Sequence, residues 1–282
     1  MKNFTSTITE SGTDARIHST FKIQPRYEPE EYHGTDTLSE RNVVITAAEY
    51  GVGKAVALAF AKEGANIVMV YHHDKQEREL DQYVKKIKSL GRKVWLFRSS
   101  IFEEFKCRKL LENIIKKVQR IDVVVNIFPI PNKAHEETHY LLKKNDTLKI
   151  QGLFTMGRLA PEYLDTNGVI INSTYICSYA QPDQLAFFSA MKAAIKNYTM
   201  EMHRMLPLYK KNLRSNGITA GFIWTESVPD FLPDYNAAPQ EISAVAPMHP
   251  YEVAPLFVFL ARKEAAMISG ETLDARGKII KV

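Results

Sequence analysis

The sequence predicts an α/β fold with a doubly wound parallel sheet, in one domain that follows a polar N-terminal arm. From residue 41 onward, short apolar segments alternate with longer segments that carry apolar residues at helical spacing. A turn with two glycines joins the first apolar segment to the first helix. Helices of this length between strands require right-handed crossovers, and these produce a parallel sheet with helices on both faces.

The expected strands are short and rich in β-branched residues, and they span 42–46, 66–71, 93–97, 122–128, 168–173, 216–224 and 272–275. The expected helices are longer and amphipathic, and they span 53–65, a charged segment that ends at 90, 102–118, 143–163, 184–203 and 251–261. No segment repeats, so we expect a single structural unit.

The composition is that of a globular protein with scattered charge. A chain of 282 residues with 45% hydrophobic residues can bury a large core. The net charge of +5 and the pI near 9.0 raise the question of nucleic-acid binding. In the basic segments 78–93 and 108–120, however, acids are interspersed with lysines and arginines, and apolar residues recur at helical spacing. This pattern favours solvated helix faces over a nucleic-acid-binding stripe.

Residues 1–40 are polar, rich in Thr, Ser, Glu and Pro, and without a sustained period. We expect either a disordered tail or an extended arm that wraps a neighbouring subunit, followed by the domain at 41–282. The first residues lack the apolar core of a signal peptide, and no apolar run reaches membrane-spanning length. Cys107 and Cys177 show no metal-binding spacing. These features predict a cytoplasmic protein without a metal site.

The turn at residues 46–57 predicts a phosphate-binding site, because glycines let a backbone approach a pyrophosphate at the start of a helix. The expected contacts are Thr46, Gly51, Val52 and Gly53. Ala47 stands where a first glycine is usual, and a positive φ there would cost about 1–2 kcal/mol. Alternatively, the two glycines serve only tight packing between the strand and the helix.

Segment 185–199 places Phe188 four residues before Lys192. In this segment and in the glycine turn, the chain resembles the short-chain dehydrogenase/reductase family, in a bacterial branch with an extended N-terminal segment. The resemblance covers residues 38–280 and implies a Rossmann-type fold, an NAD(P) cofactor and a catalytic Tyr-x-x-x-Lys pair. Phe188 occupies the tyrosine position and has no proton to exchange, whereas the lysine is kept as Lys192.

By the same resemblance, Tyr175 occupies the position of the catalytic serine, with Thr174 beside it. Gln151 occupies the position of a helix asparagine that anchors a relay water. Tyr175 could replace the missing hydroxyls with its own phenol, or it could only fill space. Related enoyl reductases place the tyrosine seven residues before the lysine, and because that position is Leu185 here, their reaction is not expected.

The resemblance assigns further cofactor contacts near the ends of the strands, at Tyr71, His72, Ser100, Asn126, Lys192, Gly221 and Thr225. Tyr71 stands where an acid usually selects NAD, while His72, His73 and Lys75 favour NADP slightly. Ala47, Ser100 and Phe128 replace residues that usually face the cofactor, so loss of nucleotide binding stays open.

The altered positions predict a protein that has lost the ordinary catalytic set and acts as a binding, scaffold or regulatory protein, that is, a pseudoenzyme. The alternative is a working NAD(P)-dependent oxidoreductase that uses Tyr175 and Lys192 on a small carbonyl or alcohol substrate. A third reading is a binder of nucleic acid or of a phosphorylated ligand. The resemblance also implies a homo-oligomer, a dimer or a homotetramer, formed through the helices at 143–163 and 184–203.

Overall fold

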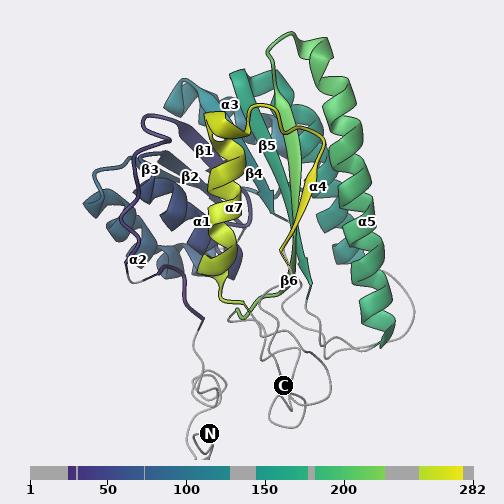
Figure 1. Ribbon diagram of the computed structural model, residues 1–282, viewed down its shortest axis with the longest axis horizontal. Helices are drawn as coiled ribbons and strands as arrows, with labels where there is room; N and C mark the ends of the chain where they lie inside the picture. Colours follow the sequence, from purple (N-terminus) through teal and green to yellow (C-terminus); the bar gives the residue numbers. More distant parts are fainter. Residues whose placement is uncertain are drawn as a thin grey trace, which may run out of the picture.

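The computed structural model describes residues 25–29, 31–72, 74–127, 144–176, 182–225 and 248–275. Within the helices and strands, the side chains at 74–76, 144–149, 174–176, 182–189, 191, 192 and 222 lie outside this description. Seven parallel strands form one sheet in the order β3-β2-β1-β4-β5-β6-β7 (Figure 1). The strands are β1 (Asn42–Ile45), β2 (Asn66–Tyr71), β3 (Val94–Arg98), β4 (Ile121–Ile127), β5 (Leu164–Ile176), β6 (Arg214–Phe222) and β7 (Thr272–Ala275).

Helices cover both faces of the sheet, as the predicted doubly wound fold requires. The described α-helices are α1 (Gly51–Lys62), α2 (Asp74–Ser89), α3 (Glu104–Val118), α4 (Lys144–Tyr163), α5 (Pro182–Met205) and α7 (Pro250–Ala261). Helix α1 packs between α2 and α7 on one face, in front of the sheet in Figure 1, whereas α4 packs against α3 and α5 on the other. The predicted α/β fold class is confirmed.

Among the described residues, two large buried clusters fill the spaces between the sheet and its helices, and a small third cluster contains Leu153 of α4 and Ile195 of α5. Alternate residues of β1 point to opposite faces, so that Val43 and Ile45 join the cluster under α1 and α7, while Val44 joins the cluster under α3 and α4. Both faces of β1 are therefore apolar, which explains why the strand reads as a continuous hydrophobic run.

Most boundaries agree with the sequence prediction, but β5 begins earlier than expected. The prediction placed its start at residue 168, whereas β5 begins at Leu164, immediately after α4. The Lys211 Nζ donates hydrogen bonds to the carbonyls of Pro161, Glu162 and Leu164, at 3.2, 2.9 and 2.9 Å. A cation distant in sequence thus satisfies the last carbonyls of α4, so no connecting loop is needed there.

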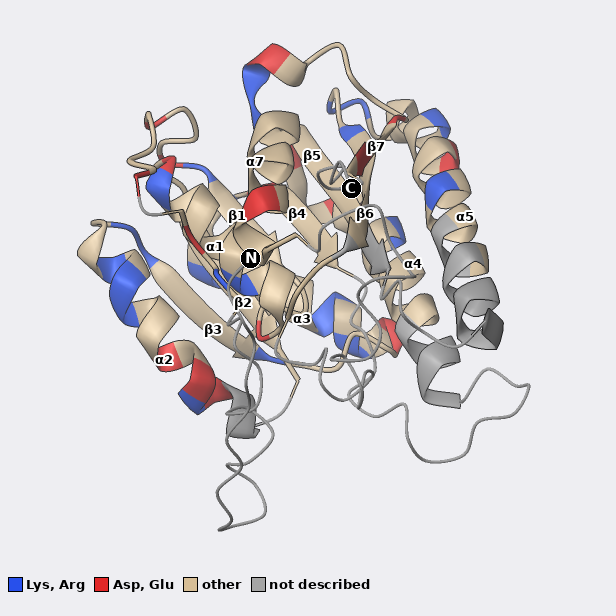
Figure 2. Cartoon of the chain, turned by 60° about the horizontal axis from the view of Figure 1, so that its bottom comes forward, with Lys and Arg blue, Asp and Glu red and all other residues tan. Residues whose placement is uncertain are grey.

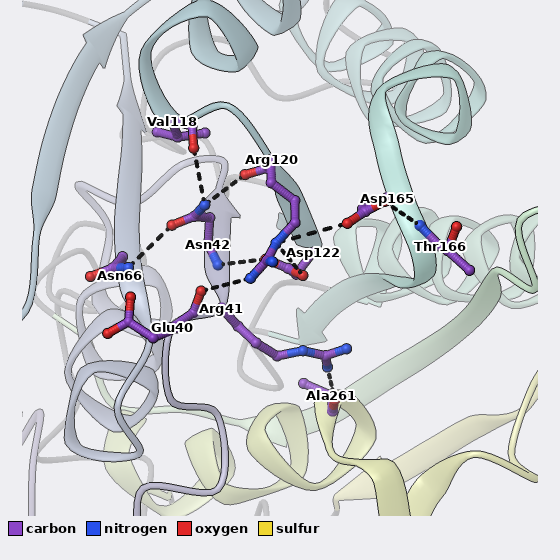
Figure 3. Close-up of polar contacts among 10 residues, drawn as sticks. All are labelled: Glu40, Arg41, Asn42, Asn66, Val118, Arg120, Asp122, Asp165, Thr166 and Ala261. Carbon is purple, nitrogen blue, oxygen red and sulfur yellow. Dashed lines mark hydrogen bonds and ion pairs between the residues drawn. The ribbon is translucent and has the colours of Figure 1, made fainter.

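A polar network links the N-terminal ends of β1, β2 and β4 (Figure 3). The backbone N–H of Asn42 donates to Asp122 Oδ2 at 2.8 Å, and the Asn42 side-chain amide donates to the carbonyl of Arg120 at 2.8 Å. Asn66 donates to Asn42 Oδ1 at 3.2 Å, and the Arg120 guanidinium lies 3.1 Å from Asp122. These contacts satisfy the polar groups at the first residues of β1, β2 and β4, so this end of the sheet has a structural role.

The described part of the arm packs on its own chain through Glu63, the residue that follows α1 and caps its C-terminus. The Glu63 carboxylate, fully buried, accepts hydrogen bonds from the Tyr32 hydroxyl and from backbone and hydroxyl groups of Thr35 and Thr37, and it pairs with Arg262 at 3.0 Å. These donors hold the pKa of Glu63 at about 2 against the opposing effect of burial. Leu38 is 1% exposed and belongs to the core. The division at residue 40 stays a prediction.

Charges of both signs lie along the exposed helix faces, and Figure 2 shows them together on α2 and on α5. None of the helices in the described ranges is long and apolar enough to span a membrane. Among the same residues, no cluster of three or more His, Cys, Asp or Glu side chains is arranged to hold a metal ion.

Candidate functional site

The candidate site lies where β1 and β4 end, at the switch point of the sheet. Strand β1 pairs with β2 on one side and with β4 on the other, so the chain continues outward in opposite directions from this point. In open α/β sheets, ligands bind in the crevice outside the carboxyl ends of the strands at such a point. The predicted residues Thr46 and Asn126 stand at these strand ends.

A chain of buried polar groups crosses the switch point. Thr46 Oγ1 accepts a hydrogen bond from the backbone N–H of Ile127 at 2.9 Å. Asn126 donates to the carbonyl of Leu153 on α4 at 2.7 Å and to Asn172 Oδ1 at 3.1 Å. Asn172 in turn donates to Thr199 Oγ1 on α5 at 3.1 Å. The network fixes α4 and α5 against the strand ends, so Asn126 positions the elements around the site through its side chain.

The turn between β1 and α1 keeps the backbone shape of a glycine turn despite its alanine. Ala47 has a φ of 49°, in the left-handed region that disfavours a residue with a Cβ atom. A Cβ added to Gly53 would lie 2.5 Å from the carbonyl oxygen of Ala47, so the helix approaches the turn too closely for any other residue. Gly51 and Val52 are buried in the first turn of α1. The helix N-terminus therefore faces the switch point.

The end of β2 is tied to this turn by a glutamate. Glu49 Oε1 accepts a hydrogen bond from the backbone N–H of His72 at 3.1 Å. The Tyr71 side chain is 5% exposed, and its hydroxyl donates to Glu77 on α2 at 2.7 Å. The His72 ring packs against Phe102, with the ring centroids 5.2 Å apart. The structure thus brings His72 to the predicted corner, while Tyr71 points into contacts with α2.

Ser100 follows β3, at the carboxyl ends of the parallel strands. Its hydroxyl accepts a hydrogen bond from the backbone N–H of Phe102 at 3.3 Å. The side chain therefore shapes the turn that carries Phe102 to His72. Phe128, which the sequence places after β4, lies outside the described residues.

The residues predicted for catalysis lie on β5 and α5. Tyr175 is near the end of β5 and pairs with Ala220 of β6, beside a register irregularity. Phe188 and Lys192 lie one turn apart on α5. The side chains of all three lie outside the described part, so their assigned roles stay predictions. On β6 and just after it, Gly221 is half-buried and Thr225 is 3% exposed.

Gln151 lies on the exposed side of α4, apart from the switch point. It lines a groove between α4 and α5 with Ile150, Phe154, Tyr198, Met202 and Met205. The Tyr198 hydroxyl donates to the Phe154 carbonyl at 2.6 Å, and the two rings pack at 4.6 Å. The structure therefore groups Gln151 with the outer face of these helices, and its assignment to a proton relay stays a prediction.

Sequence reasoning overlooked three polar residues of the region: Glu49, Asn172 and Thr199. Asn172 follows the apolar residues 169–171 within β5, and such an interruption is the signal of a buried polar group. Thr199 stands among polar residues of α5 and gives no such signal. Glu49 gives no such signal, because an acid in a turn is normally solvated, yet here it is 3% exposed.

Comparison with known proteins places the chain in a family. Residues 46–277 match a family model described as Enoyl-(Acyl carrier protein) reductase. General stress protein 39 of Bacillus subtilis is 31% identical over 270 residues, which cover 93% of this chain and 92% of that protein. Glucose and ribitol dehydrogenase of Daucus carota is 27% identical, covering 91% of this chain and 90% of that protein.

Solved structures agree on the fold. A short-chain dehydrogenase from Burkholderia cenocepacia, solved in complex with NADP, superimposes with a TM-score of 0.69 at 20% identity. The match covers 86% of this chain and 98% of that one. Together with the glycine turn at the switch point, the extent of these matches shows that the chain belongs to the short-chain dehydrogenase/reductase family.

Proposed function

We propose that the chain binds a nicotinamide nucleotide at the β1–α1 turn and has lost the ordinary proton relay of its family, so that it acts as a binding or regulatory protein. The main support for nucleotide binding is the backbone conformation of Ala47. It holds the left-handed φ of 49° that the turn requires, and Gly53 still permits the 2.5 Å approach described above. A turn kept in this shape at an energetic cost indicates a retained use.

The loss of the relay rests on Phe188. A phenylalanine can neither donate nor accept a proton, and Tyr175 stands where a serine hydroxyl would assist. Removing a general acid typically lowers a rate by about 10²–10⁴-fold, and removing its partners lowers it further. Lys192 can still hold the nicotinamide ribose on α5, so binding and catalysis can be separated.

The test measures binding and turnover in the same preparation. Calorimetric titrations with NAD, NADH, NADP and NADPH are expected to show one saturable site for at least one nucleotide. Oxidation of NADH and NADPH is then followed with a panel of small aldehydes and ketones, for the wild type and for Phe188→Tyr. We expect turnover in the wild type to stay near background. Turnover at rates typical of the family would contradict the proposal.

A second candidate function is a narrow oxidoreductase that uses Tyr175 and Lys192. The position of Tyr175 near the end of β5, next to α5 in sequence, favours it. This reading requires wild-type turnover that disappears in Tyr175→Phe but not in Thr174→Ala. The names of the relatives given above include a dehydrogenase of glucose and ribitol, so polyols belong in the substrate panel.

We also propose a homo-oligomer, a dimer or a tetramer, formed through the α4–α5 groove. Met205 is 45% exposed and lines the groove with Phe154, and Met200 is 39% exposed on the same helix, α5. Met156 and Leu159 are fully buried in the core and do not contribute, whereas Met202 lines the groove with only 3% of its surface exposed. Light scattering should give at least twice the chain mass, and Met205→Glu should lower it. A stable wild-type monomer would reject this part. The cytoplasmic location stays a prediction.

A further inference from the structure

Glu49 is a buried carboxylate with unused hydrogen-bonding capacity. Its side chain is 3% exposed, and Oε1 accepts the backbone N–H of His72 at 3.1 Å. Oε2 is buried without a hydrogen-bond partner in the described structure. Because an unsatisfied buried acceptor is costly, such groups are rare in folded proteins and tend to occur where a ligand or a mechanism uses them.

Glu49 stands at the corner that receives the adenosine end of a dinucleotide in this fold. The corner is formed by the first glycine turn and by the end of the second strand, where an acid about 20 residues past the turn usually binds the ribose 2′-hydroxyl. That acid is replaced here by Tyr71, whose hydroxyl is engaged by Glu77. Glu49 reaches the same corner from the other side, because it belongs to the turn and bonds to the first residue after β2.

The charged groups around Glu49 act in opposite directions. Burial is the largest effect and raises the pKa of Glu49 to about 7, while the backbone N–H groups and Lys54 on α1 oppose it and Glu79 on α2 adds to it. The Lys54 ammonium lies over the rings of Tyr27 and Tyr83, at 5.6 and 5.5 Å. On the β2 side, the His72 ring packs on Phe102. Near neutral pH the carboxyl is therefore divided between its neutral and charged forms.

We propose that Glu49 determines the nucleotide selectivity of the site, favouring the free ribose diol of NAD and opposing the 2′-phosphate of NADP. The inference rests on the proposed nucleotide binding. It runs against the slight preference for NADP that His72, His73 and Lys75 suggest in the sequence, because the Glu49 carboxyl is buried in the turn itself.

Two physical effects act in the same direction. A carboxylate and a phosphate repel each other strongly across a partly buried site, where solvent screening is weak. A ribose diol can instead donate to Oε2, which has no other partner in the described structure. Protonation of Glu49 removes the repulsion. Selectivity for NAD is therefore expected to be greatest above pH 7 and to weaken as the pH falls through 7.

The experiment measures the ratio Kd(NADP)/Kd(NAD) by calorimetry at pH 6.0 and at pH 8.5, for the wild type and for Glu49→Gln. The glutamine keeps the hydrogen-bond acceptor for His72 and removes the charge. Because the 2′-phosphate also titrates in this range, the variant supplies the baseline at each pH. We expect the wild-type ratio at pH 8.5 to exceed that of the variant by about tenfold, and the two ratios to converge at pH 6.0.

The matched control is Glu79→Gln, which removes an exposed acid from α2 near the same corner. Its ratio should change less than about threefold, since solvent screens an exposed charge. If Glu49→Gln fails to fold, Glu49→Asp keeps the charge and should retain the pH dependence of the wild-type ratio. Equal ratios in the wild type and in Glu49→Gln at both pH values, with NAD still bound, would overturn this inference alone. Failure of both nucleotides to bind would overturn the proposed function as well.

Discussion

Helix α1 has a buried glutamate near each of its ends, and the two are satisfied very differently. Glu63, just after the helix, accepts hydrogen bonds from Tyr32, Thr35 and Thr37 and pairs with Arg262. Glu49, just before the helix, accepts from the backbone of His72 and retains a buried oxygen without a hydrogen-bond partner in the described structure. The pKa of Glu63 falls to about 2, whereas that of Glu49 rises to about 7.

The helix dipole predicts the opposite order of these pKa values. A carboxylate is favoured near a helix N-terminus and disfavoured near a C-terminus, by about 0.3–1 kcal/mol. Each hydrogen bond to a charged acceptor contributes about 1.5–3 kcal/mol, so the donors around Glu63 outweigh the dipole. The Glu63 end is therefore satisfied by contacts that stabilise the fold, whereas the Glu49 end keeps unused hydrogen-bonding capacity where a ligand is expected.

The largest effect on stability is expected from Glu63→Ala, at the C-terminal end of α1. The substitution leaves Arg262 and the arm hydroxyls without their common partner, and we expect a loss of about 3–5 kcal/mol in the free energy of unfolding. Urea denaturation at pH 7 measures it, with the exposed Glu264→Ala as the control. In the wild type, the contribution of Glu63 is present above pH 4.5 and is lost as the pH falls towards 2. Equal stability of the two variants would show that the arm contacts carry no net energy.

Gly53→Ala should be the next most damaging change, because its Cβ would lie 2.5 Å from a backbone oxygen of the turn. We expect a loss of about 2–3 kcal/mol in unfolding free energy and loss of nucleotide binding. Ala57→Gly, inside the same helix, serves as the control and should cost about 1 kcal/mol without affecting binding. Normal nucleotide affinity in folded Gly53→Ala would contradict the proposal that the nucleotide binds at the β1–α1 turn.

The opposite titration of the two glutamates can be measured directly. Ionisation of buried Glu49 opposes folding, because the charged form is less stable in the folded than in the unfolded state. The free energy of unfolding of the wild type should therefore fall as the pH rises from 4.5 through 7. Glu49→Gln should therefore exceed the wild type by about 3 kcal/mol at pH 8.5 and by less than about 1 kcal/mol at pH 5. Thermal unfolding at the two pH values tests this. A pH-independent difference would mean that Glu49 is already charged, or is solvated, in the folded state.

The smallest effect is expected from Ala47→Gly, which relieves the left-handed strain in the turn. A gain of about 0.5–1 kcal/mol should remain after the greater entropy of unfolded glycine is subtracted. Ala48→Gly, at the neighbouring buried position, should instead lose stability. If both variants lose stability equally, the φ of 49° at Ala47 is not a source of strain.

The framework of the fold was predictable from local patterns, and the polar contacts were not. Strands β2 and β7 were predicted at 66–71 and 272–275, where they are observed, because hydrophobic runs and turn residues mark them. The early start of β5 was missed because Lys211, far along the chain, satisfies the end of α4.

The candidate site divides in the same way. Thr46, Gly53 and Asn126 were predicted from their motif positions, and the structure places them together at the switch point. The role of Glu49 could not be predicted, because its burial depends on how the turn packs against β2 and α2. A polar residue in a turn is exposed unless elements distant in sequence pack over it, and the local sequence does not predict such packing.

We propose above all that the β1–α1 turn still binds a nicotinamide nucleotide although the proton relay of the family is lost. Calorimetric titrations of the wild type with NAD and with NADP at pH 8, with Gly53→Ala measured in parallel, provide the decisive test. We predict one saturable site in the wild type and none in the variant. Absence of wild-type binding at millimolar nucleotide would contradict the claim.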